Sequence, residues 1–247
     1  MNNIKVEQKG RVITVMIDRE KSTNPLNIET LEEIEEALKD ERKIGIIYGN
    51  NRAFSAGADI NLFTQMDPQK AYDFARRGHD VMDFIQSRKM PVIAAIHGFA
   101  LGGGFELALS CDYRIAHPST VFGLPEITLG ILPGFGGTQR LLRIVGETKA
   151  FELVSRGLKF NAEKALSMNI INEIQEDYLG RAREIASEYE SLPYEALANI
   201  KELIRKPADS GFEMEKEYFG DLFRTENQKE GAKAFLEKRK ANFNKNI

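Results

Sequence analysis

The chain has 247 residues, a hydrophobic content of 42% and a formal net charge of −3 at pH 7. This length is enough for one large domain with an appended segment. Lys and Arg are spread along the chain without forming a basic stripe, which argues against a nucleic-acid-binding protein.

The composition also limits the compartment and the metal content. The single cysteine, Cys111, cannot form an internal disulfide and lies in an apolar helical run, so we expect a buried core residue in a reducing, cytoplasmic protein. The first ten residues have neither signal nor transit character, and no apolar run approaches the ~20 residues of a membrane span. Three histidines are scattered without metal-ligand spacing, so we expect no metal site: His79, His97 and His117.

Short strands and one helix are predicted for the first fifty residues. Residues 3–18 alternate between apolar and polar side chains around the turn Lys9-Gly10, which predicts a hairpin. A turn at 22–27 leads into a helix, because apolar residues recur at helical spacing at positions 28, 31, 34 and 38. Residues 44–49 are typical of a short buried strand.

Small residues follow this strand. The segment 53–60 (AFSAGADI) exposes backbone N–H groups, and Asp59 can cap the start of a short helix. A further helix is predicted within residues 61–90, starting at Asp67-Pro68, with apolar side chains along one face.

Residues 91–140 are the most informative stretch. An apolar run at 92–96 predicts a buried strand, and three glycines at 102–104 precede an apolar helix that contains Glu106. A carboxylate in the first turn of a buried helix is unfavourable without a partner or a chemical task. Glycines let another molecule approach the free N–H groups and the positive end of the helix dipole. The segment therefore predicts a donor site for a developing oxyanion, with an acid or base one turn away.

A second carboxylate, Glu126, also lies among apolar residues, ahead of a glycine-rich turn at 133–138. Burial raises the pKa of a carboxyl group toward neutrality, so two such groups suit general acid–base chemistry. A structural alternative needs no catalysis: Glu126 caps a helix, and Glu106 pairs with an arginine in the core. The spacing alone leaves both interpretations open.

Helices dominate the rest of the chain. Residues 149–155 and a run from 162 predict helices before a strand at 170–174, and from Pro193 onward the pattern is helical only, with a turn at 206–211. The last helices have broad apolar faces and little core of their own. We expect them to pack on the preceding domain or on another subunit.

Four motifs give the chain a long and specific likeness to one family. Residues 96–108 (IHGFALGGGFELA), 122–126 (FGLPE), 133–140 (PGFGGTQR) and 230–240 (EGAKAFLEKRK) resemble, in order and spacing, signatures of the enoyl-CoA hydratase/isomerase (crotonase) family. The resemblance implies an α/β fold with a crotonase-like spiral of ββα turns over residues 1–190. It also implies a C-terminal α-helical region over residues 191–247 that forms homotrimers or homohexamers.

The same resemblance assigns roles to individual residues. The N–H groups of Ala58 and Gly103 would form an oxyanion hole, and Glu106 and Glu126 would be the catalytic carboxylates. Substrate or coenzyme A contacts are implied for Asn24, Leu26, Ala56, Asp59, Ile60, Gly134, Phe235 and Lys238, the last two reaching a neighbouring subunit. The family commonly has Asn-Ala-Leu where this chain has Asn24-Pro25-Leu26, and proline removes one N–H donor there.

The activity that the resemblance implies is that of an enoyl-CoA hydratase. This hydro-lyase of fatty acid β-oxidation adds water reversibly, with syn geometry, to a trans-2-enoyl-CoA and gives a 3-hydroxyacyl-CoA. No cofactor is expected, because coenzyme A is part of the substrate, and neither a nucleic acid nor a membrane is an expected partner.

Two alternatives come with this resemblance. A Δ3,Δ2-enoyl-CoA isomerase usually needs one carboxylate where this chain has two, and other acyl-CoA enzymes of the family call for Asp, His or Tyr elsewhere. An RNA-binding homologue would need a basic surface, which a pI of 5.8 disfavours.

Overall fold

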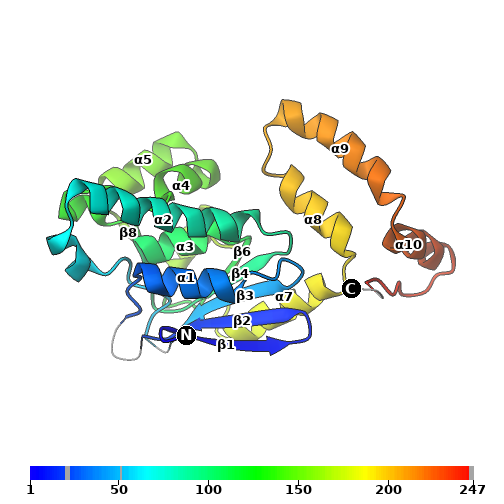
Figure 1. Ribbon diagram of the computed structural model, residues 1–247, viewed down its shortest axis with the longest axis horizontal. Coiled ribbons are helices and arrows are strands. Elements are labelled where there is room, and N and C mark those ends of the chain that lie inside the picture. The colour runs from blue at the N-terminus through cyan, green and yellow to red at the C-terminus, as the bar shows by residue number, and fades with distance from the viewer. Residues whose placement is uncertain (20–22, 51, 245–247) are drawn as a thin grey trace.

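A six-stranded sheet forms the base of the fold (Figure 1). The structure is a computed structural model that describes residues 1–19, 23–50 and 52–244; position 22 of the predicted turn and positions 245–247 of the predicted C-terminal region lie outside the described residues. The first two strands are antiparallel and the other pairs are parallel. In spatial order the strands are β1 (Ile4–Lys9), β2 (Val12–Ile17), β3 (Ile44–Gly49), β4 (Val92–Ile96), β6 (Tyr113–Ala116) and β9 (Glu173–Ile174).

Helices cover both faces of this sheet (Figure 1). All five residues of β4 are buried, and successive side chains of a strand point to opposite faces. Ile93 and Ala95 share a core with α7, whereas Ala94 and Ile96 belong to the larger core on the other face. The larger core lies under α1 (Ile28–Ala37), α2 (Pro68–Ser87) and α3 (Gly103–Ser110), and α7 (Tyr178–Glu190) covers the other face of the sheet.

A second, three-stranded sheet holds the segment that enters α3. In it, β5 (Phe99–Leu101) pairs in parallel with β7 (Val121–Gly123), which pairs antiparallel with β8 (Lys159–Asn161). Around this sheet lie two 3-10 helices and three α-helices: η1 (Ile60–Gln65), η2 (Glu126–Leu129), α4 (Gly137–Val145), α5 (Glu147–Ser155) and α6 (Ala162–Ser167).

The predicted hairpin and the predicted helix starts are confirmed. Asn27 caps α1 by accepting a hydrogen bond from the Thr30 N–H at 2.9 Å. Asp67 caps α2 in the same way at 2.8 Å, with Pro68 in the first turn. Asp59 caps η1 as expected. Each cap satisfies an N–H group that the first turn of a helix leaves free.

Four features differ from the prediction. The strand expected at 170–174 contains only its last two residues, because the Ile170 N–H closes α6 by bonding to Ala165 O at 2.9 Å. Helix α9 begins at Ala208, inside the predicted turn, and Cys111 is buried but follows α3 as its C-cap rather than lying within it. Helix α7 was not predicted from the sequence.

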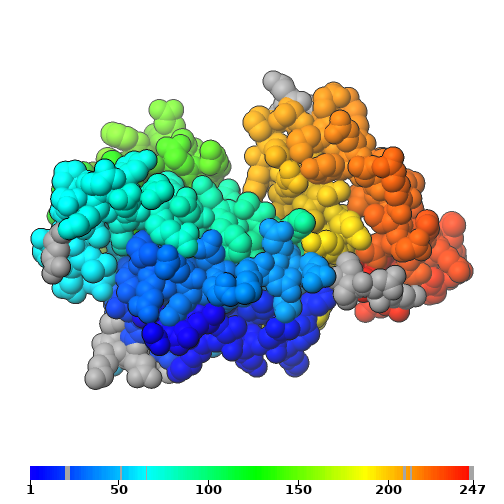
Figure 2. Space-filling model, viewed as in Figure 1, coloured from blue at the N-terminus to red at the C-terminus, as the bar shows by residue number. Residues whose placement is uncertain are grey.

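The last three helices form an arm that extends away from the sheets (Figure 1) and stands beside the body in Figure 2. They are α8 (Tyr194–Leu203), α9 (Ala208–Leu222) and α10 (Glu226–Leu236). Asp112 ties α8 to the body through Lys201 at 2.7 Å and Arg205 at 2.6 Å. Large apolar side chains of the arm are more than half exposed: Ile200, Ile204, Phe219, Phe223, Phe235 and Leu236. Exposed apolar surface of this kind marks interaction sites.

Within the described part of the chain, no helix is both long and apolar enough to cross a lipid bilayer.

Candidate active site

Two backbone amides, those of Ala58 and Gly103, converge at the start of α3. The segment before Ala58 runs parallel to β5, since the Ser55 N–H bonds to Phe99 O at 2.9 Å and the Leu101 N–H bonds to Ser55 O at 3.0 Å. This pairing places the Ala58 nitrogen 3.5 Å from the point where a Cβ on Gly103 would lie. The two residues are 45 positions apart by their numbers, yet their amides are neighbours.

Both amides are available to a ligand. Among the described residues, neither the Ala58 N–H nor the Gly103 N–H donates a hydrogen bond to the protein. Gly103 is the first residue of α3, where N–H groups have no partner within the helix and the dipole favours negative charge. Gly102 makes the entry turn with φ 49° and ψ −129°, a conformation that glycine tolerates best.

Glu106 projects from the first turn of α3 and is only 1% exposed. Its Oε1 accepts two backbone hydrogen bonds, from the Phe135 N–H at 2.8 Å and the Gly137 N–H at 2.7 Å. Both acceptor positions of this oxygen are therefore used, and Oε2 is the oxygen left for a proton or for a ligand in the cavity.

Glu126 is the first residue of η2 and lines the same cavity as Glu106. Its Oε1 lies 3.0 Å from the point where a Cβ on Gly102 would be. Its Oε2 is buried and has no hydrogen-bond partner among the described residues. A buried polar atom without a partner is unfavourable, which is typical of a site that awaits a ligand or water.

Burial changes the acidity of both groups. It raises the pKa of Glu106 to about 7, and the nearby Glu126 carboxyl adds to this increase, while the two backbone bonds and Arg140 oppose it. Burial also raises the pKa of Glu126 to about 7. Two carboxyl groups that titrate near neutrality can each hold or release a proton at physiological pH.

The structural alternative for these glutamates does not match the geometry. The Arg140 guanidinium bonds to Phe135 O, Gln86 and Asp83 rather than to Glu106. The N-cap of η2 is Pro125, and no side chain supplies a cap bond there. Glu106 is therefore not bonded to an arginine, and Glu126 does not cap a helix.

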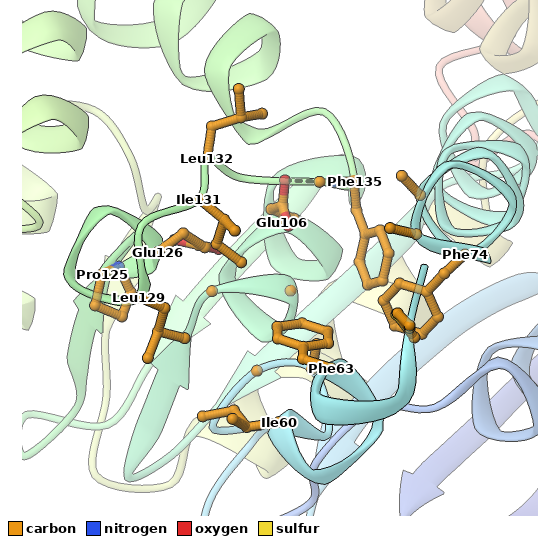
Figure 3. Close-up of a pocket in the computed structure, with 18 of the residues that line it drawn as sticks. Ile60, Phe63, Phe74, Glu106, Pro125, Glu126, Leu129, Ile131, Leu132 and Phe135 are labelled. Atoms are coloured by element: carbon orange, nitrogen blue, oxygen red, sulfur yellow. Dashed lines mark hydrogen bonds between the residues drawn. The ribbon is translucent and has the colours of Figure 1, made fainter. Parts of the chain in front are cut away.

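The two carboxyls and the residues of the two amides line one largely apolar cavity of about 780 Å³ (Figure 3). Residues of α2 form one wall of the cavity. The opposite wall is formed by apolar residues that follow Glu126. It was not predicted, although the apolar run at 127–132 in the sequence could have indicated it. The labelled wall residues are Ile60, Phe63, Phe74, Pro125, Leu129, Ile131, Leu132 and Phe135.

The residues predicted to contact substrate or coenzyme A fall into three groups. Ala56, Ile60 and Gly134 line the cavity, and Asp59 lies beside it, paired with Arg19 at 3.4 Å. Phe235, in α10, and Lys238, just after it, are exposed and do not line the cavity of their own chain; α10 lies at the end of the arm, far from α2 and α3 (Figure 1).

Asn24 and Leu26, the third group, are fully buried and do not line the cavity. The Asn24 side chain accepts from the Arg19 and Asn50 nitrogens and donates to Ala53 O at 2.8 Å, while the Leu26 backbone pairs with residues 57 and 59. In this structure both residues pack in the scaffold beside the cavity.

Histidine, cysteine and acidic side chains form no cluster of three or more that could hold a metal ion in the described ranges 1–19, 23–50 and 52–244.

Together these groups form a site that can stabilise charge on a carbonyl oxygen while moving protons nearby. Two convergent N–H donors can bind a developing oxyanion, and two carboxyls of raised pKa can act as general acid and base. The chain belongs to the enoyl-CoA hydratase/isomerase family, whose sequence model matches residues 7–246.

Known proteins of this family resemble the chain along its whole length. The short-chain-enoyl-CoA hydratase of Clostridium acetobutylicum is 39% identical and is covered to 97%, as is this chain. The crotonyl-CoA hydratase of Syntrophomonas wolfei is also 39% identical, over 98% of this chain and 97% of its own. The crystal structure of an enoyl-CoA hydratase from Bacillus anthracis superposes with a TM-score of 0.91 at 34% identity, covering 98% of both chains.

Proposed function

We propose that this protein is an enoyl-CoA hydratase that adds water reversibly to a trans-2-enoyl-CoA and forms a 3-hydroxyacyl-CoA. The observation that carries this proposal is the presence of two carboxyls, Glu106 and Glu126, beside two free amides in one apolar cavity. The names of the relatives from Clostridium acetobutylicum and Syntrophomonas wolfei support the same activity.

The two amides would bind the thioester carbonyl oxygen. When water attacks the β-carbon, the electrons of the double bond move toward the carbonyl and an enolate oxyanion develops. Donors that are already oriented stabilise this charge without reorganising, and one such donor contributes ~3–4 kcal/mol to the transition state. In this proposal Ala58 and Gly103 supply the electrostatic part of catalysis.

The two glutamates would hold the attacking water between them. One carboxylate removes a proton from the water as its oxygen bonds to the β-carbon, and the other carboxyl gives a proton to the α-carbon of the enolate. The sum is the addition of one water, with hydroxyl on the β-carbon and hydrogen on the α-carbon. We propose Glu106 as the group that activates water and Glu126 as the proton donor.

Coenzyme A is part of the substrate in this scheme, and no further cofactor takes part. The competing proposal, a Δ3,Δ2-enoyl-CoA isomerase, needs one carboxyl to move a proton between two carbons and leaves the second without a task. The second glutamate therefore favours hydration. An RNA-binding role is disfavoured by the pI of 5.8, and a salt-titrated RNA-binding assay tests it.

We further propose that the chain works in the cytoplasm as a trimer or a hexamer, with residues 1–190 as the catalytic domain and residues 191–247 as the assembly region. The exposed apolar side chains of the arm support this arrangement. Phe235 and Lys238 would then reach the coenzyme A bound by a neighbouring subunit.

The test is hydration of crotonyl-CoA by the wild type and by the variants Glu106→Gln and Glu126→Gln. Mass spectrometry distinguishes hydration, which adds one water to the substrate, from isomerisation of a 3-enoyl-CoA, which leaves the mass unchanged. Each variant should lose ~10²–10⁴-fold in kcat with little change in KM, since binding depends on the backbone. Glu163→Gln, at an exposed position of α6, is the control. A wild type that adds no water, or a glutamine variant with near-full activity, contradicts the proposal.

A further inference from the structure

The turn at residues 135–137, which leads into α4 at Gly137, supplies both hydrogen bonds that hold Glu106. The Phe135 and Gly137 N–H groups reach the same Oε1, at 2.8 and 2.7 Å. A Cβ on Gly137 would lie 2.9 Å from Glu106 Cγ and Oε1, so the turn approaches the carboxyl closely. The position of Glu106 thus depends on what holds this turn in place.

Arg140, one turn into α4, is the side chain that holds it. Its Nη1 donates to Phe135 O at 2.7 Å, so it binds the same residue whose N–H binds Glu106. Arg140 is 7% exposed, and a Cβ on Gly136 would lie 2.2 Å from its Nη1. The turn is wrapped directly against the guanidinium.

The guanidinium is itself fixed to a different element. Nε donates to Gln86 Oε1 at 2.7 Å and Nη2 donates to Asp83 Oδ1 at 2.5 Å, and both partners belong to α2. Arginine presents its donors in a rigid planar fork, which lysine cannot reproduce. All three guanidinium nitrogens donate a hydrogen bond, and these bonds connect α2 to the turn whose amides hold Glu106.

We propose that Arg140 is a positioning residue for the hydration reaction: it anchors the 135–137 turn to α2, so that the turn's two amides hold Glu106 Oε1 and leave Oε2 to bind the reacting water. This inference rests on the proposed hydratase function. Arg140 lies near Glu106 without bonding to it, so it also supplies a positive charge that favours the ionised carboxylate. Other charged or titratable groups also face this region: Glu126 of η2, Asp83 and His79 of α2, Arg143 of α4, and Arg205, which follows α8.

Two substitutions separate the geometric effect from the charge. Arg140→Gln removes both the fork and the charge, whereas Arg140→Lys keeps the charge and loses the fork. Arg143→Gln, at an exposed position on the same helix, is the matched control. We expect kcat for crotonyl-CoA to fall about 100-fold in Arg140→Gln, the effect of displacing a catalytic group by about 1 Å, with KM nearly unchanged. Arg140→Lys should show the same kcat loss, because the lysine keeps the charge but cannot anchor the turn.

The acid limb of the kcat profile should move to higher pH in both variants, because the two amide bonds that favour the ionised Glu106 carboxylate are weakened, and it should move further in Arg140→Gln, which also loses the cation. NMR titration of ¹³C-labelled glutamate carboxyls, with Glu106→Gln to assign the signal, measures the same pKa without turnover. It therefore tests the inference even if the wild type fails to hydrate crotonyl-CoA, in which case the proposed function alone is wrong.

The double variant Asp83→Ala/Gln86→Met keeps Arg140 and removes both of its acceptors on α2, so it tests the inference if Arg140→Gln does not fold. It should lower kcat in the same direction as Arg140→Lys. The inference is overturned if Arg140→Lys and the double variant both keep the wild-type kcat, or if a folded Arg140→Gln keeps the wild-type kcat and Glu106 pKa.

Discussion

Glu106 and Glu126 face one cavity but are held in different ways. Two amides fix one oxygen of Glu106, whereas the buried Oε2 of Glu126 has no partner among the described residues. A fixed carboxyl suits the orientation of a water molecule, and a carboxyl with an unused oxygen can follow the proton that it transfers. The proposed division of roles between the two glutamates follows from this difference.

The raised pKa of Glu106 also predicts how stability depends on pH. The pKa lies near 7 in the folded protein against an ordinary value of 4.5, so the folded state binds a proton that the unfolded chain releases between these values. The contribution of this group to stability is therefore fully present below pH 4.5 and is lost as the pH rises through 7. The decrease is on the order of 3 kcal/mol for a group shifted this far.

Glu106→Gln should remove this pH dependence. Its amide oxygen can accept the same two backbone bonds, and the side chain never ionises. Denaturant unfolding at constant protein concentration should show Glu106→Gln more stable than the wild type above pH 7 and equal to it below pH 4.5. Glu163→Gln should follow the wild type throughout. If the curve of Glu106→Gln is parallel to the wild type's across the whole range, the buried carboxyl is not ionising as described.

At the scale of elements, the contact between α2 and the 135–137 turn depends on one residue without a side chain. A Cβ on Gly78 of α2 would lie 2.0 Å from Phe135 Cδ1, and the Phe135 ring also packs against Phe74 with centroids 5.2 Å apart. Gly78 is thus a notch that receives the aromatic ring.

Replacing Gly78 by alanine should destabilise the protein by ~1–3 kcal/mol, the usual effect of overpacking. This reverses the normal gain of up to about 1 kcal/mol for alanine over glycine within a helix. The displaced Phe135 carries the N–H that holds Glu106, so kcat should fall as well. Thermal unfolding and kinetics measure both effects.

Gly220 in α9 is the matched control, because a Cβ there meets no atom within 4 Å. Gly220→Ala should leave stability unchanged or raise it. Equal stability of the two alanine variants would show that the notch at Gly78 has no structural importance.

Much of this element structure could be predicted because its signals are local. The hairpin, the caps at Asn27 and Asp67, and the buried strand β4 follow from turn chemistry and periodicity. Strand β9 was overestimated because Ile170 and Ile171 are buried between the end of α6 and the start of β9, and an apolar run of this kind has the pattern of a buried strand.

The site was predicted by motif and completed by long-range contacts. The four chemical groups lie in motifs that the sequence displays, and the structure brings them together. The amides that hold Glu106 are 29 and 31 residues away along the chain, so only the path of the turn reveals them. The burial of Asn24 and Leu26 likewise depends on tertiary packing that their own segment does not encode.

For the whole molecule, the arm is the feature that predicts assembly. Its exposed apolar side chains have no cover within the described chain, although α8 is held to the body by the ion pairs of Asp112. We expect light scattering to give a trimer or a hexamer of the 27.9 kDa chain. A fully active monomer would contradict this expectation.

Assembly should also complete the substrate site. If Lys238 of one subunit offers its charge to a phosphate of the coenzyme A bound by the next, Lys238→Ala should raise KM more than it lowers kcat. Lys240→Ala, another exposed lysine two positions away, should leave both constants unchanged. An unchanged KM in Lys238→Ala would remove the proposed contact and leave the assembly itself untouched.

The two free amides have a consequence for how this protein can evolve. Every amino acid except proline keeps its backbone N–H, so a point mutation at codon 58 or 103 can displace the donor but rarely deletes it. The carboxyls, in contrast, are erased by a single codon change. The oxyanion-binding part of the proposed chemistry thus depends on the backbone conformation rather than on the identity of the residues. The side chain at position 58 can therefore change to suit a new acyl group while its N–H donor persists.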